Sequence, residues 1–194
     1  MPLQTVQNVV VIGSSAGGPR ILKEMFSGLP KLKAGMVLVQ HMPKFINQSL
    51  KESIERVTGM VVAIARDGDA LENGKVLIAP SEQHVAFVQN RGVRLFNGQK
   101  VNFVCPSVDV AMLSLLRFSG MQCIGVILSG MGRDGADGMA HIKHIRGVTI
   151  AQNEETCAVF GMPKEAIATG CVDYVLSPGA IREKLIDLVG IAHR

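Results

Sequence analysis

Three residues of this chain, Ser15, His41 and Asp134, carry side chains that can cooperate in nucleophilic catalysis. A serine hydroxyl is a weak nucleophile and needs a neighbouring base to take its proton. An imidazole is such a base when a carboxylate fixes its tautomer and stabilises its charged form. Each of the three residues follows an apolar run that is typical of a buried strand. We therefore interpret them as a candidate nucleophile, base and orienting acid.

Each of these side chains also has a purely structural interpretation. Ser15 lies in a glycine-rich turn that fits the pattern G-x-S-x-G, but such a serine is more often a cap or a backbone support. His41 precedes a proline and can be a partly buried histidine with its hydrogen bonds satisfied. Asp134 can cap the helix that follows it. The chain order, Ser, His and then Asp, also differs from the Ser–Asp–His order of α/β-hydrolases.

The sequence does not indicate a metal or a cofactor. His141 and His144 are three residues apart on a predicted helix, but no third ligand is evident, so an exposed helix face is the favoured interpretation. The glycines of residues 13–18 lack the G-x-G-x-x-G spacing of a dinucleotide-binding turn. The cysteines show no C-x-x-C spacing, which favours reduced thiols over disulfides or zinc. They are Cys105, Cys123, Cys157 and Cys171.

The elements around the candidate residues explain how they could meet. Residues 9–12 are four β-branched residues in a row and predict a buried strand. A turn of small residues follows, and Pro19 suits the first turn of a helix over residues 21–26. His41 and Asp134 follow other predicted strands in the same way. Because the carboxyl ends of parallel strands share one edge of a sheet, we expect the three residues to converge there.

The rest of the chain alternates strands and helices, which predicts one α/β domain with a mostly parallel sheet and helices on both faces. Residues 76–79, 84–88 and 93–96 instead form short strands with turn residues between them. We expect these to be an inserted antiparallel hairpin or meander. Further strands are predicted at 35–40, 60–65, 123–128, 148–152 and 171–176, and further helices at 47–57, 107–120, 139–145, 163–168 and 178–188.

Composition excludes several classes of protein. The 194 residues are 47% hydrophobic, enough for one well-filled domain. The net charge of +4 comes without a run of Lys or Arg and with few aromatic residues, so no nucleic acid partner is expected. No apolar run is long enough to insert in a membrane. Residues 1–5 lack the positive charge of a signal peptide, so we expect a cytoplasmic protein.

Five blocks in order along the chain closely resemble the catalytic domain of the chemotaxis protein-glutamate methylesterase (CheB) family. The resemblance runs from about Val9 to about Val189. It implies Ser15 as nucleophile, His41 as base and Asp134 as the residue that orients the base. It also implies a Rossmann-like, doubly wound sheet with the inserted antiparallel piece. The blocks are residues 12–18 (IGSSAGG), 40–43 (QHMP), 106–110 (PSVDV), 125–135 (GVILSGMGRDG), and 151–154 (AQNE) continuing to 160–163 (FGMP).

The resemblance implies a serine esterase that hydrolyses glutamate γ-methyl esters on chemoreceptor-type proteins, with deamidation of receptor glutamines as a second activity. Its partner would be a methylated chemoreceptor-type protein. The backbone N–H groups of Ala16 and Met131 are the candidates for holding the oxyanion, because both lie in glycine-rich segments after strands. The alternative is a protein of the same fold that binds a receptor or signalling partner without catalysis.

The sequence departs from the family pattern at a few positions. Ser14 stands where the family commonly has alanine, Ala16 where it often has threonine, and Arg133 where asparagine is common. Family members usually carry an N-terminal receiver domain. We expect residues 1–194 to be a single catalytic domain without it, and a separate protein to supply any receiver domain.

Overall fold

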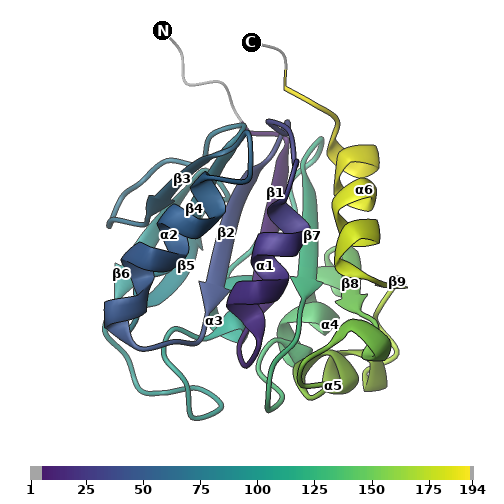
Figure 1. The fold of residues 1–194 in the computed structure, drawn as a ribbon. Coiled ribbons are helices and arrows are strands. Elements are labelled where there is room, and N and C mark those ends of the chain that lie inside the picture. Colours follow the sequence, from purple (N-terminus) through teal and green to yellow (C-terminus); the bar gives the residue numbers. More distant parts are fainter. Residues whose placement is uncertain (1–5, 193–194) are drawn as a thin grey trace, which may run out of the picture.

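A computed structural model describes residues 6–192 of the chain (Figure 1). Residues 1–5, where the sequence shows no signal peptide, lie outside the described residues. The strands are β1 (Asn8–Ser14), β2 (Gly35–Gln40), β3 (Val61–Ile64), β4 (Lys75–Ile78), β5 (His84–Val88), β6 (Gly92–Phe96), β7 (Gln122–Ile127), β8 (Val148–Gln152) and β9 (Tyr174–Leu176). The α-helices are α1 (Gly18–Phe26), α2 (Asn47–Glu55), α3 (Val108–Leu113), α4 (Ala136–His144), α5 (Met162–Ala168) and α6 (Pro178–Val189), with 3₁₀ turns η1 (Lys44–Ile46) and η2 (Glu154–Thr156).

Seven strands form one parallel sheet in the order β3-β4-β2-β1-β7-β8-β9. The chain leaves β1 toward β2 on one side and later returns to its other side as β7, so the strand order reverses at β1. Ligand sites in such sheets lie beyond the carboxyl ends of the strands at this reversal. Ser14 is the register partner of Gln40, which sets Ser15 beside His41 just past the two strand ends.

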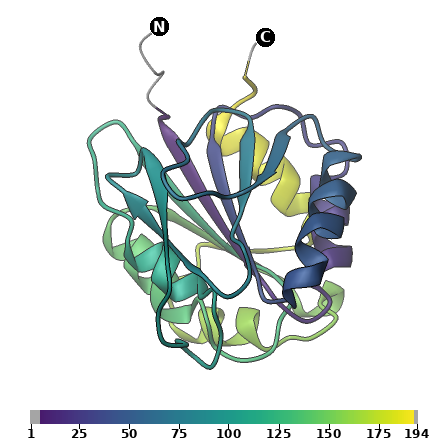
Figure 2. The same cartoon turned by 90° about the vertical axis from the view of Figure 1, so that its left-hand side faces the viewer.

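Helices cover both faces of the sheet, as predicted. Helices α1, α2 and α6 lie on one face, where α1 packs against both of the others (Figure 1). Helices α3, α4 and α5 lie on the other face together with the β5–β6 hairpin, as the turned view shows (Figure 2). The side chains of β1 alternate between two separate cores. Val10 and Ile12 pack in the core on the first face, and Val9 and Val11 pack in the core on the second. Within residues 6–192, no helix has the length and apolar character needed to cross a membrane.

The inserted antiparallel piece is smaller than the sequence analysis expected. Strands β5 and β6 pair antiparallel, which confirms the hairpin. The first of the three short strands does not join them, because β4 pairs parallel with β2 and β3 in the main sheet. Its residues Val76, Leu77 and Ile78 are all fully or almost fully buried. Such a continuous apolar run is typical of a parallel strand that is covered on both faces.

Helix α3 also ends earlier than predicted, at Leu113 instead of near residue 120. The reason is a tertiary contact from the hairpin. The side chain of Asn90 accepts a hydrogen bond from the Leu116 N–H at 3.0 Å and donates one to the Leu116 carbonyl at 2.6 Å. These bonds satisfy backbone groups that a longer helix would have paired internally.

Candidate active site

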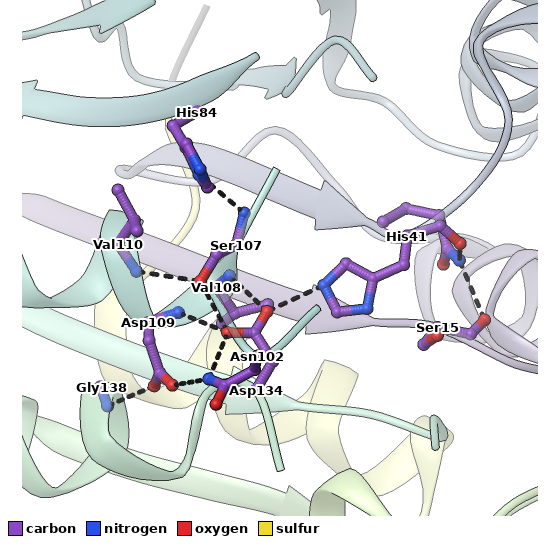
Figure 3. Close-up of polar contacts among 11 residues, drawn as sticks. Ser15, His41, His84, Asn102, Ser107, Val108, Asp109, Val110, Asp134 and Gly138 are labelled. Carbon is purple, nitrogen blue, oxygen red and sulfur yellow. Dashed lines mark hydrogen bonds and ion pairs between the residues drawn. The ribbon is translucent and has the colours of Figure 1, made fainter. Parts of the chain in front are cut away.

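The fold brings Ser15, His41 and Asp134 together at the carboxyl edge of the sheet. Ser15 follows β1, His41 follows β2, and Asp134 lies in the loop between β7 and α4. The His41 Nε2 atom lies 2.8 Å from Asp134 Oδ2. Figure 3 shows the imidazole between the carboxylate and Ser15, with its other nitrogen on the side of the serine. The exposed fraction is 9% for the His41 side chain and 3% for the Asp134 side chain, so this hydrogen-bonded pair is shielded from water.

The loop that carries Ser15 is held against the loop after β7. The Ser15 N–H donates to the Ser129 carbonyl at 3.0 Å, and the Ser129 hydroxyl donates to the Ala16 carbonyl at 2.8 Å. Glycine is required where the loops meet, because a Cβ on Gly130 would lie 2.8 Å from Ser15 Cβ. The half-buried Ser15 is therefore fixed in its backbone. Its hydroxyl makes no hydrogen bond within residues 6–192.

The second nitrogen of the His41 ring has a distinct environment. Nδ1 is buried and has no hydrogen-bond partner within the described part of the chain. With Nε2–H donating to the carboxylate, the neutral ring keeps its lone pair on Nδ1. Buried polar atoms without a partner are rare and call for a functional explanation. If the Ser15 hydroxyl moved closer when substrate binds, it would donate the missing hydrogen bond to Nδ1. Hydrogen bonds of a catalytic site often tighten only in the substrate complex.

The carboxylate of Asp134 collects donors from the start of α3. The Ser107 hydroxyl donates to Oδ1 at 2.7 Å, the Val108 N–H donates to Oδ2 at 2.7 Å and the Asp109 N–H donates to Oδ1 at 3.2 Å. Burial has the largest effect and would raise the pKa of Asp134. The hydrogen bonds from His41, Ser107 and Val108 outweigh burial together and hold the pKa below its ordinary value. The side chain therefore stays ionised beside the imidazole.

This arrangement contradicts the capping interpretation of Asp134. The N-cap of α4 is Gly135, which is left-handed with φ 99°, and no side chain caps that helix. The predicted cap of α3 is confirmed, because the Ser107 hydroxyl accepts the Val110 N–H. Ser107 thus links two tasks, since it caps α3 and donates to Asp134.

A second buried carboxylate lies next to this network. Asp109, 2% exposed, accepts the Gly138 N–H on Oδ1 and the Asn102 side-chain amide on Oδ2, both at 2.7 Å. Burial raises the pKa of Asp109 from its ordinary value of 3.8 to about 6, against the Gly138 hydrogen bond and with a contribution from the charge of Asp134. The Asn102 amide also approaches Asp134 Oδ1 at 3.4 Å, so it bridges the two carboxylates (Figure 3).

Gln40 is a site residue that the sequence analysis missed. Its side-chain amide donates to the carbonyls of Ser15 and His41, both at 2.9 Å. One buried amide therefore connects the backbone of the candidate nucleophile to that of the candidate base. The signal was available, because Gln40 is the one polar side chain in the run of β2, and buried polar residues are informative.

His84 is a second residue with a supporting contact that was missed. Its Nδ1 accepts the Ser107 N–H at 3.2 Å, and its Nε2 bonds the Gln99 carbonyl at 2.9 Å. The side chain is 1% exposed. His84 lies in the hairpin, as predicted, and it fixes the backbone of the residue that donates to Asp134.

The two histidines of α4 do not form a metal site. His144 is exposed, while His141 is half-buried and bonds the Leu115 carbonyl at 2.9 Å. Across residues 6–192, no group of three or more His, Cys, Asp or Glu side chains is placed to hold a metal ion. All four cysteines are free thiols.

A pocket of about 470 Å³ opens beside His41. It lies between the segment that follows β2 and the segment that leads into α3. Its walls include Met42, Lys44, Phe103 and Cys105. Met131 lies in the loop after β7, next to the Ser15 loop, and its side chain is 77% exposed. A substrate can therefore approach His41 from solvent through this pocket.

The fold and the site define a doubly wound α/β protein with a serine beside a histidine–aspartate pair at the carboxyl edge of its sheet. Comparison with known proteins then identifies the family. The chain belongs to the CheB methylesterase family, whose model matches residues 10–185.

Curated relatives carry the same description in their names. A Pseudomonas aeruginosa protein named protein-glutamate methylesterase/protein-glutamine glutaminase 2 is 41% identical over 179 residues, which are 90% of this chain and 51% of that protein. A Pyrococcus horikoshii protein named protein-glutamate methylesterase/protein-glutamine glutaminase is 40% identical over 186 residues, which are 94% of this chain and 50% of that protein. This chain spans about half the length of the curated relatives it matches.

A solved structure covers almost the same length. The crystal structure of the Thermotoga maritima CheB methylesterase catalytic domain matches with a TM-score of 0.86 and 41% identity. The match covers 93% of this chain and 98% of that one. It confirms the predicted fold class, a doubly wound sheet with an inserted hairpin.

Proposed function

We propose that this chain is a serine esterase that hydrolyses glutamate γ-methyl esters on chemoreceptor-type proteins. The observation that carries the proposal is the convergence of Ser15 with the shielded His41–Asp134 pair in a member of the CheB methylesterase family. The names of the curated relatives support the same substrate.

The first step of the proposed reaction forms a bond between Ser15 Oγ and the carbonyl carbon of the ester. His41 Nδ1 takes the hydroxyl proton as this bond forms. The resulting imidazolium donates its Nε2–H to Asp134, whose negative charge stabilises it. The carbonyl oxygen becomes a tetrahedral oxyanion.

The backbone N–H groups of Ala16 and Met131 are the proposed donors to that oxyanion. Within residues 6–192, neither N–H is engaged in a hydrogen bond to another protein group. The two residues lie in the loops after β1 and β7, which pack against each other through Ser129. Two unpaired donors on adjoining loops beside the nucleophile are what an oxyanion site requires.

The second half of the reaction releases the products. The oxyanion collapses, the C–O bond to the methoxy group breaks, and His41 returns its proton so that methanol leaves. Water then attacks the acyl-enzyme with His41 again as base, which frees Ser15 and leaves a glutamate carboxylate. With a glutamine side chain the same attack would release ammonia instead of methanol, which accounts for deamidation as a second activity.

Three further expectations accompany this proposal. A cytoplasmic location stays a prediction, and so does a receiver domain supplied by a separate protein. Residues 1–194 acting as one catalytic domain is likewise part of the proposal.

The test is methanol release from methylated chemoreceptor fragments incubated with the purified chain. Ser15→Ala should lower the rate by about 10³-fold or more. Ser14→Ala is the matched control, since this neighbouring hydroxyl is buried and donates to the Ser129 carbonyl at 3.4 Å. It should keep most of the activity. A fluorophosphonate probe should label the unmodified chain at Ser15 and leave the Ser15→Ala variant unlabelled.

A folded chain that binds receptor fragments but releases no methanol and takes no label would overturn the proposal. That outcome would support the alternative, a non-catalytic protein that binds a receptor or signalling partner. Retention of more than a tenth of the activity by Ser15→Ala would instead reject Ser15 as the nucleophile.

A further inference from the structure

The segment at the mouth of the pocket has an unusual backbone. Val101 and Val104 exchange two backbone hydrogen bonds, at 3.1 and 3.0 Å, and close a tight turn. Both residues between them are left-handed, with φ 52° for Asn102 and φ 67° for Phe103. Turns of this kind favour asparagine followed by glycine, because a side chain at the second position is strained. A phenylalanine at that position is therefore strained.

The side chain of Asn102 fastens this turn to the buried network of the site. Its amide donates to Asp109 Oδ2 at 2.7 Å and approaches Asp134 Oδ1 at 3.4 Å. Asp109 is itself held by the Gly138 N–H. Asp109 takes no part in the proposed reaction. Its hydrogen bond from Asn102 instead anchors the turn that carries Phe103.

Packing of the Phe103 ring within the fold does not offset the strain of its backbone. It is 94% exposed, so it adds almost no buried apolar surface to the core. Single exposed apolar residues are ordinary on protein surfaces. Phe103 differs because its backbone is strained and because it lines the pocket beside His41. Strained residues that the surroundings hold in place are typical of sites that meet a ligand.

We propose that Phe103 is a specificity-determining residue that packs against an apolar side chain of the protein substrate next to the methylated glutamate. This inference rests on the proposed function. The anchored turn holds the ring at the pocket mouth before the substrate arrives, so binding does not need to order it. Attack on an ester at Ser15 requires no contact with the ring, whereas a protein surface lying over the pocket would cover the ring. Phe103 thus favours protein substrates over small esters.

The experiment compares kcat/KM for methylated receptor fragments with kcat/KM for p-nitrophenyl acetate. Replacing Phe103→Gly removes the ring and relieves the left-handed strain, so the variant should fold at least as well as the parent. The ratio of the two values should fall about tenfold, as for the loss of a buried aromatic contact. Phe103→Tyr keeps the ring and should retain the ratio within about twofold.

Phe118→Ala is the matched control. Phe118 is 39% exposed and lies in the segment before β7, at the amino edge of the sheet, away from the pocket. It should leave the ratio unchanged. A Phe103→Gly ratio within twofold of the parent overturns the inference. Equal losses on both substrates also overturn it, because the turn would then support only the catalytic groups. A parent chain that hydrolyses the small ester but not the receptor fragments overturns the proposed substrate instead.

Discussion

His41 bonds Asp134 through its Nε2 atom, at 2.8 Å, and so keeps Nδ1 as the ring nitrogen on the side of Ser15. This contact requires an acceptor at residue 134. An amide in its place can present an N–H to the ring and favour the other tautomer, which has no lone pair on Nδ1.

Asp134→Asn should therefore lower methyl-ester hydrolysis by roughly 10⁴-fold, by analogy with the same change in a serine protease. The buried amide would also oppose the Val108 N–H, so a stability loss of about 1–3 kcal/mol is expected. Ser107→Ala is the control, because it removes one donor to the carboxylate and the cap of α3 but leaves the ring tautomer unchanged. Steady-state kinetics and thermal unfolding of both variants separate the effects. Asparagine activity within tenfold of the parent would reject Asp134 as the orienting residue.

Ser15 and His41 should behave as one catalytic unit. Each single alanine variant should lose about 10³-fold or more in kcat, and the double variant should be no slower than either, because removing one member already disables proton transfer. Methanol release by the three variants measures this. A double variant whose loss equals the product of the two single losses would show that the two side chains act independently.

Gln40→Met tests the amide that joins the two halves of the site. The substitution keeps a similar volume but removes the donor to the Ser15 and His41 carbonyls. A small shift of either backbone misplaces the reacting groups, so kcat should fall by about 10- to 100-fold with KM little changed. Gln48→Met, on the exposed side of α2, is the control. A lower melting temperature with kcat within threefold of the parent would mean that Gln40 serves the fold alone.

Asp109 should make the stability of the protein fall with pH. Because burial raises its pKa to about 6, the folded chain holds a proton that the unfolded chain has already lost above the ordinary value of 3.8. Unfolding then releases that proton, so the free energy of unfolding decreases as the pH rises from about 4 to about 6. Asp109→Asn cannot titrate and should lack this decrease.

Denaturant unfolding of both proteins at pH 4 and pH 7 measures the effect. The free energy of unfolding of the variant minus that of the parent should be about 2 kcal/mol larger at pH 7 than at pH 4. A pH-independent difference between the two proteins would show that Asp109 is ionised throughout this range in the folded state.

Local patterns predicted the scaffold well because they depend on neighbours in the chain. The apolar run of residues 9–12 and the small-residue turn after it are a strand and a turn in the structure, and strand β2 has the predicted bounds of Gly35–Gln40. Ser107 caps α3 as expected. The predictions that were wrong depended on contacts between residues far apart in the chain. Asn90 binds the backbone of Leu116 and α3 ends at Leu113, and β4 pairs with β2 in the main sheet and not with the hairpin.

The sequence by itself determined that Ser15, His41 and Asp134 would lie at the carboxyl edge of a parallel sheet, because each follows a buried strand. Only the tertiary structure decided how they are connected. The register of β1 with β2 set Ser15 beside His41, and the start of α3 supplied three of the donors to Asp134. Strand and helix periodicity is written in adjacent residues, whereas a hydrogen bond across 26 residues leaves no local pattern and forms only when the layers pack.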